Sequence, residues 1–117
     1  MTIILHITTP EAWEAAQDSG WLTTPSLDDE GFIHCSTHAQ LEATANRVFA
    51  GAGDLLLLEV ETDELTSELR WERATDVGDD FPHIYGPLDV EAVMGTIDLP
   101  MRPDGSYRFN SSRSTGE

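Results

Sequence analysis

Apolar and polar positions along the chain alternate between short β-type segments and two amphipathic helical segments. Residues 2–8 read TIILHIT, and this short run of mostly β-branched residues predicts a first strand. Residues 9–11 read TPE, which predicts a helix start with a capping hydroxyl, a proline in the first turn and an acid beside it. We expect this helix to end at Gly20. Its predicted inner stripe consists of Ala12, Trp13, Ala16 and Gln17.

A second helix is predicted after a brief strand at residues 32–35. Thr37 and Gln40 match the capping-box pattern, in which each side chain satisfies the backbone N–H of the other residue. The predicted stripe of this helix consists of Leu41, Ala45, Val48 and Phe49, with Thr44 as its one polar member. We expect Gly51 or Gly53 to end the helix.

The second half of the chain is mostly β in pattern. Residues 54–61 read DLLLLEVE, a continuous apolar run typical of a strand that is buried on both faces. Residues 64–73 predict a helical turn and then a short strand around residues 69–72, and residues 77–88 predict a loop, a short strand and a turn. Residues 89–99 predict a capped helical turn followed by a strand. This order predicts an α+β fold with two main helices.

Length and composition bound the organisation of the chain. At 117 residues we expect a single domain over residues 1–110, followed by a flexible tail at residues 111–117 that has no apolar anchor. The one cysteine cannot form an internal disulfide, which suits a reducing compartment. No apolar run approaches the ~20 residues of a membrane helix, and the N-terminus has no signal-peptide pattern. We therefore expect a cytoplasmic protein without a membrane partner.

The charge balance narrows the range of partners. The chain has 22 acidic and 6 basic residues, all six of them arginine, and a formal net charge of -16. A surface this acidic repels polyanions, so nucleic acid is not an expected partner. GxGxxG, Walker-type, HExxH and CxxC motifs are absent, which argues against a Rossmann or P-loop nucleotide site.

Histidines and hydroxyl residues concentrate in residues 30–40, which read EGFIHCSTHAQ. His34 and Ser36 lie where a strand leads into a helix, whose free N–H groups favour carboxylates and phosphates. Thr37 either adds to this anion site or only caps the helix. Strand alternation points Cys35 the other way, toward a core, and a thiol nucleophile activated by a histidine is the alternative.

Five further residues carry candidate chemistry. His6 lies between two apolar neighbours in the first strand, so it either joins a buried hydrogen-bond network or contacts a ligand. His83 and Tyr85 share one face of an extended segment and could converge on one ligand. Glu72 is either a general base or stabiliser of a cationic transition state, or a solvated ion-pair partner. Arg47 either faces an anionic ligand or forms a surface salt bridge. The histidines lack a well-placed third ligand, so no metal is expected.

Six segments occur in an order that resembles a known family: ILHIT, EGFIHCST, ANRVFAG, DLLLLEV, RWE and FPHIYGPL. Together they resemble, over residues 3–99, the small bacterial family catalogued as domain of unknown function 952. More remotely, their order resembles the ADP-ribosyltransferase superfamily, which includes RNA 2'-phosphotransferases.

The superfamily resemblance implies a split, mostly antiparallel β core that grips NAD in a cleft, with NAD as substrate. It implies that His6 binds the adenosine ribose side, and that His34 and Ser36 lie near the nicotinamide ribose. The third motif of the superfamily, Gln-x-Glu or Glu-x-Glu, has no clear counterpart here, and Glu72 or His83 is the nearest candidate. The missing basic surface argues against phosphotransferase activity.

We therefore expect a nucleotide-sized cleft for NAD or ADP-ribose, with ADP-ribosyl transfer or NAD-glycohydrolase chemistry. The expected catalytic residues are Glu72 and His83. The expected ligand-binding residues are His6, Thr8, His34, Ser36, Thr37, Arg47 and Tyr85. Two alternatives stay open: a non-catalytic module that binds a small anion or a partner, and a hydrolase or transferase that uses Cys35 with a histidine.

Overall fold

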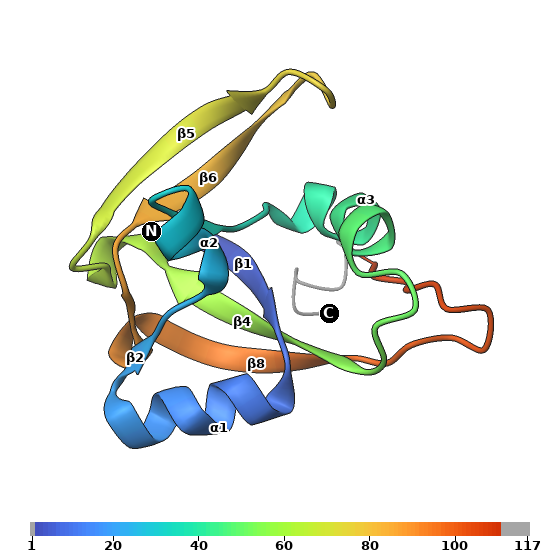
Figure 1. Cartoon of the computed structure of the whole chain (residues 1–117), viewed down its shortest axis with the longest axis horizontal. Coiled ribbons are helices and arrows are strands. Elements are labelled where there is room, and N and C mark those ends of the chain that lie inside the picture. Colours follow the sequence, from blue (N-terminus) through green and yellow to red (C-terminus); the bar gives the residue numbers. More distant parts are fainter. Residues whose placement is uncertain (1, 111–117) are drawn as a thin grey trace.

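Two antiparallel sheets of three strands each form the core of the α+β fold, which a computed structural model describes for residues 2–110 (Figure 1). The first sheet has the strand order β1 (Ile3–Thr8), β4 (Leu55–Glu61) and β8 (Val93–Leu99). The second sheet has the order β3 (Ile33–His34), β6 (Asp79–Tyr85) and β5 (Glu68–Ala74). A small antiparallel pair consists of β2 (Trp21–Leu22) and β7 (Leu88–Asp89). The antiparallel character of the predicted core is confirmed.

The α-helices in this part of the chain are α1 (Pro10–Ser19), α2 (Pro25–Asp29) and α3 (His38–Val48). The predicted caps of the two long helices are confirmed. The Thr9 hydroxyl accepts a hydrogen bond from the Ala12 N–H at 3.1 Å, and Gly20 ends α1 with a left-handed φ of 91°. Thr37 and Gln40 form both bonds of the capping box at the start of α3. Short 3₁₀ helices, η1 (Thr62–Glu64) and η2 (Val90–Ala92), precede β5 and β8.

The structure corrects three details of the predicted helices. Helix α2 lies in a segment predicted as loop, because its five residues are too few to show helical periodicity. Helix α3 ends at Val48, before the glycines expected to end it, and the Val48 side chain is 60% exposed instead of facing the core. In α1, Ala16 is buried, whereas Ala12 and Gln17 are exposed.

Strand β4 lies in the middle of the first sheet and is buried on both faces, as predicted. Leu56 and Leu58 on one face belong to a cluster that includes Ala16 of α1. Leu55 and Leu57 on the other face pack with the buried residues of α3. Each fully buried leucine contributes about 1.5–3 kcal/mol to the free energy of unfolding, so this strand stabilises both halves of the core.

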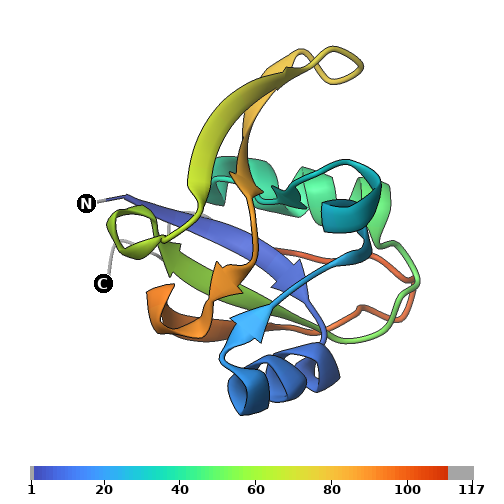
Figure 2. The same cartoon turned by 60° about the vertical axis from the view of Figure 1, so that its left-hand side comes forward.

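Strands β5 and β6 form a hairpin that extends from the body of the domain (Figure 2). Each has seven residues, so the hairpin is longer than the short strands predicted from sequence. Its far half holds no buried apolar pair, and the backbone ladder is supported there by the Arg73–Asp80 ion pair at 3.2 Å. The Gln40 side chain also donates to the Asp79 carboxylate at 2.8 Å and to the Asp80 carbonyl at 2.7 Å. These bonds tie the hairpin to the start of α3.

A backbone bridge between Leu5 and Ser36 joins the two sheets. Each residue donates its N–H to the carbonyl of the other at 2.8 Å. Beyond this bridge no further β pairing between β1 and β3 occurs within residues 2–110, so the two sheets splay apart. The last residues of β1 therefore have no strand partner on this side and border an open space.

The segment after β8 packs back onto the domain, with Tyr107 and Phe109 buried against the α3 side of the core. The predicted flexible tail at residues 111–117 lies outside the described residues. No helix within residues 2–110 is both long enough and apolar enough to cross a membrane.

Candidate functional site

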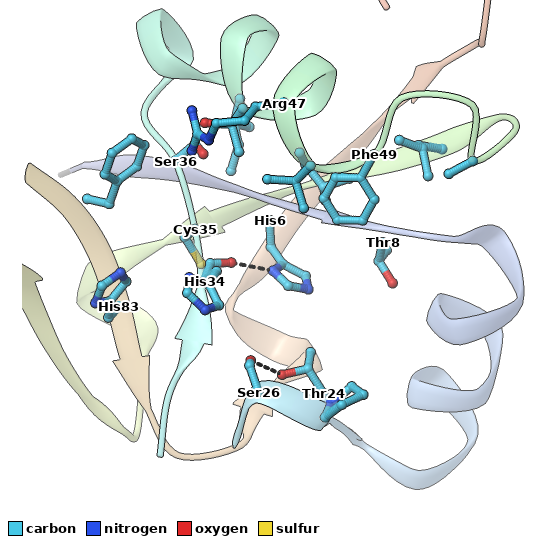
Figure 3. A pocket seen from close by; sticks show the side chains of 18 of the residues that line it. His6, Thr8, Thr24, Ser26, His34, Cys35, Ser36, Arg47, Phe49 and His83 are labelled. Atoms are coloured by element: carbon cyan, nitrogen blue, oxygen red, sulfur yellow. Dashed lines mark hydrogen bonds between the residues drawn. The ribbon is translucent and has the colours of Figure 1, made fainter. Parts of the chain in front are cut away.

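A cavity of about 790 Å³ occupies the space where the two sheets splay apart. Its floor comes from the second half of β1 and from residues 34–36, and its walls come from α3, from the start of α2 and from the tip of the β5–β6 hairpin. Apolar side chains such as Phe49, Leu55 and Phe81 form much of the lining. Figure 3 shows His6 and Thr8 projecting from β1 into this space, with Phe49 next to them.

His6 is fixed in one tautomer at the floor of the cavity. Its Nδ1 lies 2.8 Å from the His34 carbonyl oxygen (Figure 3), and because a carbonyl only accepts, Nδ1 carries the proton. Burial lowers the pKa of His6 below its ordinary value, so the neutral ring is favoured. The remaining nitrogen, Nε2, is then an unprotonated hydrogen-bond acceptor. The two roles left open by the sequence, network member and ligand contact, are compatible in this geometry.

Three polar side chains at the floor are nearly buried, and each still has one polar atom without a partner. The exposed fractions are 6% for His6, 9% for Thr8 and 2% for Ser36. No hydrogen bond within residues 2–110 uses His6 Nε2, Thr8 Oγ1 or Ser36 Oγ. Within residues 2–110, Thr44 Oγ1 is the one buried side-chain N or O atom that is inaccessible to solvent and has no hydrogen-bond partner. The three floor atoms are therefore accessible, and the surface they expose is that of the cavity.

Arg47 supplies the positive charge of the cavity. It lies in the last turn of α3, and its guanidinium carbon is 5.9 Å from the centre of the Phe81 ring. Among residues 2–110 no carboxylate forms a salt bridge with it, and Asp76 is the one acidic residue in the lining. The surface salt bridge considered as an alternative is thus absent from the described part of the chain. The contact with an anionic ligand stays a prediction.

His34 and His83 lie side by side at the edge of the cavity, with ring centres 5.3 Å apart (Figure 3). Each ring is held by a glutamate: His34 Nε2 lies 2.5 Å from Glu30, and His83 Nδ1 lies 2.7 Å from Glu72. Phe32 stacks on the His83 ring at 4.0 Å with an interplanar angle of 18°. The strand register explains the grouping, because His34 pairs with His83 and alternate residues share one face of the sheet.

Glu72 and Tyr85 lie next to the cavity and do not line it. Their side chains project from the β5–β6 hairpin, where the Tyr85 hydroxyl donates to Glu72 Oε1 at 2.6 Å. The hydrogen bonds from Tyr85 and then from His83 hold the pKa of Glu72 below its ordinary value. The guanidinium of Arg70 lies 4.2 Å from the centre of the Tyr85 ring. Neither side chain forms part of the cavity wall, and the roles expected for Glu72 in catalysis and for Tyr85 in ligand binding stay predictions.

Thr37 is also placed apart from the cavity. Its hydroxyl accepts from the Gln40 N–H at 3.2 Å, so it caps α3, and it is not among the lining residues. Helix α3 contributes its C-terminal half to the wall, from Thr44 onward, instead of its N-terminus. The anion site predicted at this helix start is therefore not part of the cavity.

Cys35 belongs to the apolar core beside α1, as strand alternation predicts. Burial raises the pKa of its thiol far above the ordinary value, and this keeps the sulfur in the unreactive thiol form. Within residues 2–110 no group of three or more His, Cys, Asp or Glu side chains is arranged to hold a metal ion.

Several residues that line the cavity are not predicted from the sequence. Thr24 and Ser26 reach the cavity because of the short helix α2, and their hydroxyls are bonded to each other at 2.7 Å. Asp76 and Val77 reach it from the hairpin tip, which no local pattern places there. Thr44 did carry a signal, since it is the one polar residue on the apolar stripe of α3.

Comparisons with known proteins identify the family of the chain. The model of a family described as "Protein of unknown function (DUF952)" matches residues 7–96. The crystal structure of protein CC0527 from Caulobacter crescentus is similar to this structure, with a TM-score of 0.82 and 36% sequence identity over 92% of this chain and 94% of that chain. The solution NMR structure of CC0527 gives a TM-score of 0.76 and 37% identity over 91% of each chain. No curated protein matches the chain. The match covers most of the domain, and the chain belongs to the DUF952 family.

Proposed function

We propose that the cavity binds a nucleotide of the NAD or ADP-ribose type. The observation that carries the proposal is the set of three nearly buried polar side chains at the floor, His6, Thr8 and Ser36, whose free polar atoms have no partner within residues 2–110. A desolvated polar atom left unpaired costs about 1–3 kcal/mol. A ligand that forms hydrogen bonds with these atoms recovers that free energy, and structural side chains in a core are normally paired already.

The lining matches the three chemical parts of a nucleotide. Hydroxyl groups of a ribose could donate to His6 Nε2 and exchange hydrogen bonds with Thr8 and Ser36. The apolar wall, which includes Phe49, suits a flat base. Arg47 suits a phosphate, because a guanidinium forms paired hydrogen bonds to phosphate oxygens. The volume of about 790 Å³ is within the range of about 300–1,000 Å³ found for small-molecule sites.

The proposed reaction is cleavage of the bond between nicotinamide and ribose in NAD, with transfer of the ADP-ribosyl group to water or to an acceptor. One observation supports it directly, the His83–Glu72 pair at the edge of the cavity. The core of two antiparallel sheets is also compatible with the split core that the sequence resemblance to the ADP-ribosyltransferase superfamily implies. Resemblance of folds raises the expectation for a reaction and does not establish it. A cytoplasmic location is part of this proposal, since the one cysteine needs no oxidising compartment.

A non-catalytic binding module is the second candidate, and one observation favours it. Glu72, the nearest counterpart of a catalytic acid, does not line the cavity, and one of its carboxylate oxygens already accepts from both His83 and Tyr85. A module of this kind would bind ADP-ribose or a related small anion through the same floor and the same arginine, without turnover.

Isothermal titration with ADP-ribose and NAD tests the binding. We expect saturable heat for the wild type and at least about tenfold weaker binding for His6→Ala, which corresponds to about 1.4 kcal/mol. His38→Ala is the matched control, because His38 is half-buried near Phe109 and does not line the cavity. No heat at millimolar ligand with folded protein would refute the proposal.

Incubation with NAD then separates the two candidates. Release of nicotinamide that is lost in His83→Ala supports the transferase or glycohydrolase. Binding of ADP-ribose without any nicotinamide release supports the non-catalytic module.

A further inference from the structure

Glu72 holds the imidazole of His83 in a fixed state. The carboxylate oxygen Oε1 lies 2.7 Å from His83 Nδ1, and it also accepts from the Tyr85 hydroxyl at 2.6 Å. Both bonds favour the ionised carboxylate, which is why the pKa of Glu72 is lowered. An ionised carboxylate only accepts, so the bond requires the proton of the neutral ring to be on Nδ1.

The other nitrogen of His83 is left free at the cavity. Nε2 forms no hydrogen bond within residues 2–110, and the one unpartnered side-chain atom that is inaccessible to solvent there is Thr44 Oγ1. Solvent or a ligand therefore reaches Nε2, and His83 lines the cavity although its side chain is only 12% exposed. The stacked Phe32 ring restricts rotation of the imidazole. The ring thus presents an unprotonated nitrogen in a defined direction.

A carboxylate, a histidine oriented by it and a nearby nucleophile form the common arrangement for nucleophilic catalysis in proteins. Here the first two parts are present, and no serine, threonine or cysteine of residues 2–110 is hydrogen-bonded to His83 Nε2. The thiol of Cys35 is buried in the core with a raised pKa. No such side chain is held at Nε2 within residues 2–110, which leaves this position open to water or to the hydroxyl of an acceptor.

We propose that His83 is the general base of the reaction, that it acts on water or on the hydroxyl of an acceptor, and that Glu72 is a positioning residue that acts through it. This inference rests on the proposed function, with NAD as the ADP-ribosyl donor. The hydroxyl oxygen forms a bond to C1 of the ribose, and its proton moves to His83 Nε2. The bond from C1 to the nicotinamide nitrogen breaks, and its electron pair neutralises the charge of the ring. Nicotinamide leaves, and the proton passes from His83 to solvent.

The tautomer of His83 is the first test, and it needs no ligand. Long-range proton–nitrogen spectra of the protein labelled with ¹⁵N-histidine, recorded at alkaline pH, report which ring nitrogen carries the proton. We expect Nδ1–H in the wild type and a mixture of both tautomers in Glu72→Ala. Tyr85→Phe is the matched control, because it removes the other bond to the same oxygen and keeps the bond to His83. A wild-type proton on Nε2, or an unchanged tautomer in Glu72→Ala, would overturn the role of Glu72.

The rate of nicotinamide release from NAD is the second test. General bases contribute about 10²–10⁴-fold, so we expect His83→Ala and Glu72→Ala to lose about 100-fold in rate with little change in affinity for ADP-ribose. Glu72→Gln keeps the size of the side chain and replaces Glu72→Ala in this test if the alanine variant folds poorly. Its rate of nicotinamide release is expected to be intermediate. A Glu72→Ala protein with altered tautomer and undiminished rate would overturn the base role of His83.

The two tests distinguish failure of this inference from failure of the proposed function. Wild-type protein that binds ADP-ribose and releases no nicotinamide would overturn the base role while nucleotide binding stands. Wild-type protein that binds no nucleotide would refute the proposed function, and the tautomer would still decide whether Glu72 positions His83.

Discussion

Substitution of two serines in the same cavity separates a ligand-binding hydroxyl from a structural one. Ser26 Oγ donates to the Phe32 carbonyl at 2.8 Å and contacts the Thr24 hydroxyl at 2.7 Å. Ser36 Oγ has no partner within residues 2–110, although Ser36 is only 2% exposed. Ser26→Ala should therefore lower the free energy of unfolding by about 1–2 kcal/mol, since a hydrogen bond is lost and a carbonyl is left unpaired. Ser36→Ala should leave it unchanged or raise it by up to about 1–3 kcal/mol, because no bond is lost and an unpaired hydroxyl is removed.

Urea denaturation of the wild type and both variants measures these differences, provided that the slope with denaturant stays constant. A loss of 1 kcal/mol corresponds to about 4 °C in Tm for a domain of this size, so thermal unfolding gives a second readout. The order should reverse for ligand binding: Ser36→Ala should weaken ADP-ribose binding by about 2- to 10-fold. If Ser36→Ala destabilises the fold as much as Ser26→Ala, the Ser36 hydroxyl is structural and the reasoning is wrong.

Three further predictions follow from single residues. Burial lowers the pKa of His6 in the folded state, while the unfolded chain keeps the ordinary value of 6.5. Because the unfolded state takes up the proton first, the free energy of unfolding should fall as pH drops below about 6.5. His6→Gln should flatten this pH dependence in a series of urea titrations. Gly86→Ala should lower the free energy of unfolding by at least about 1–3 kcal/mol in chemical denaturation, because Gly86 has a φ of 151° and an added methyl collides with Ser67. In the control Gly95→Ala, the added methyl meets only the end of a flexible carboxylate. Gln40→Ala should lower the free energy of unfolding by about 1–2 kcal/mol and speed amide hydrogen exchange in the β5–β6 hairpin, because this side chain completes the cap of α3 and bonds the start of β6. Unchanged exchange there would show that the hairpin is held by other contacts.

Features decided within a few residues could be predicted from sequence. The caps at Thr9 and Thr37 act over three or four positions, so they can be read directly from the chain, and the structure has both. The same holds for β4, whose apolar run has to be buried on both faces wherever it lies. Cys35 faces the core because strand alternation is a property of the backbone alone.

The walls of the cavity could not be derived from the local pattern of the chain, because they depend on contacts between distant segments. The cavity exists because pairing of β1 with residue 36 stops after one bridge, and because the hairpin tip and the end of α3 close its walls. Glu72 is expected from the sequence as a catalytic residue or an ion-pair partner, and its bonds to His83 and Tyr85 depend on the register of β5 with β6. Register and sheet divergence are set by tertiary packing, so local pattern carries little information on either.

An amide proton–nitrogen NMR titration of the intact protein with ADP-ribose tests nucleotide binding in the cavity most directly. We expect saturable shifts of the signals of Thr8, Ser36 and Arg47, which surround the cavity from three segments. Signals near the shallow surface formed by Gly51 and Gly105, outside the cavity, should not move. An unchanged spectrum at millimolar ADP-ribose, or shifts confined to that surface, would contradict the claim that this cavity is a nucleotide site.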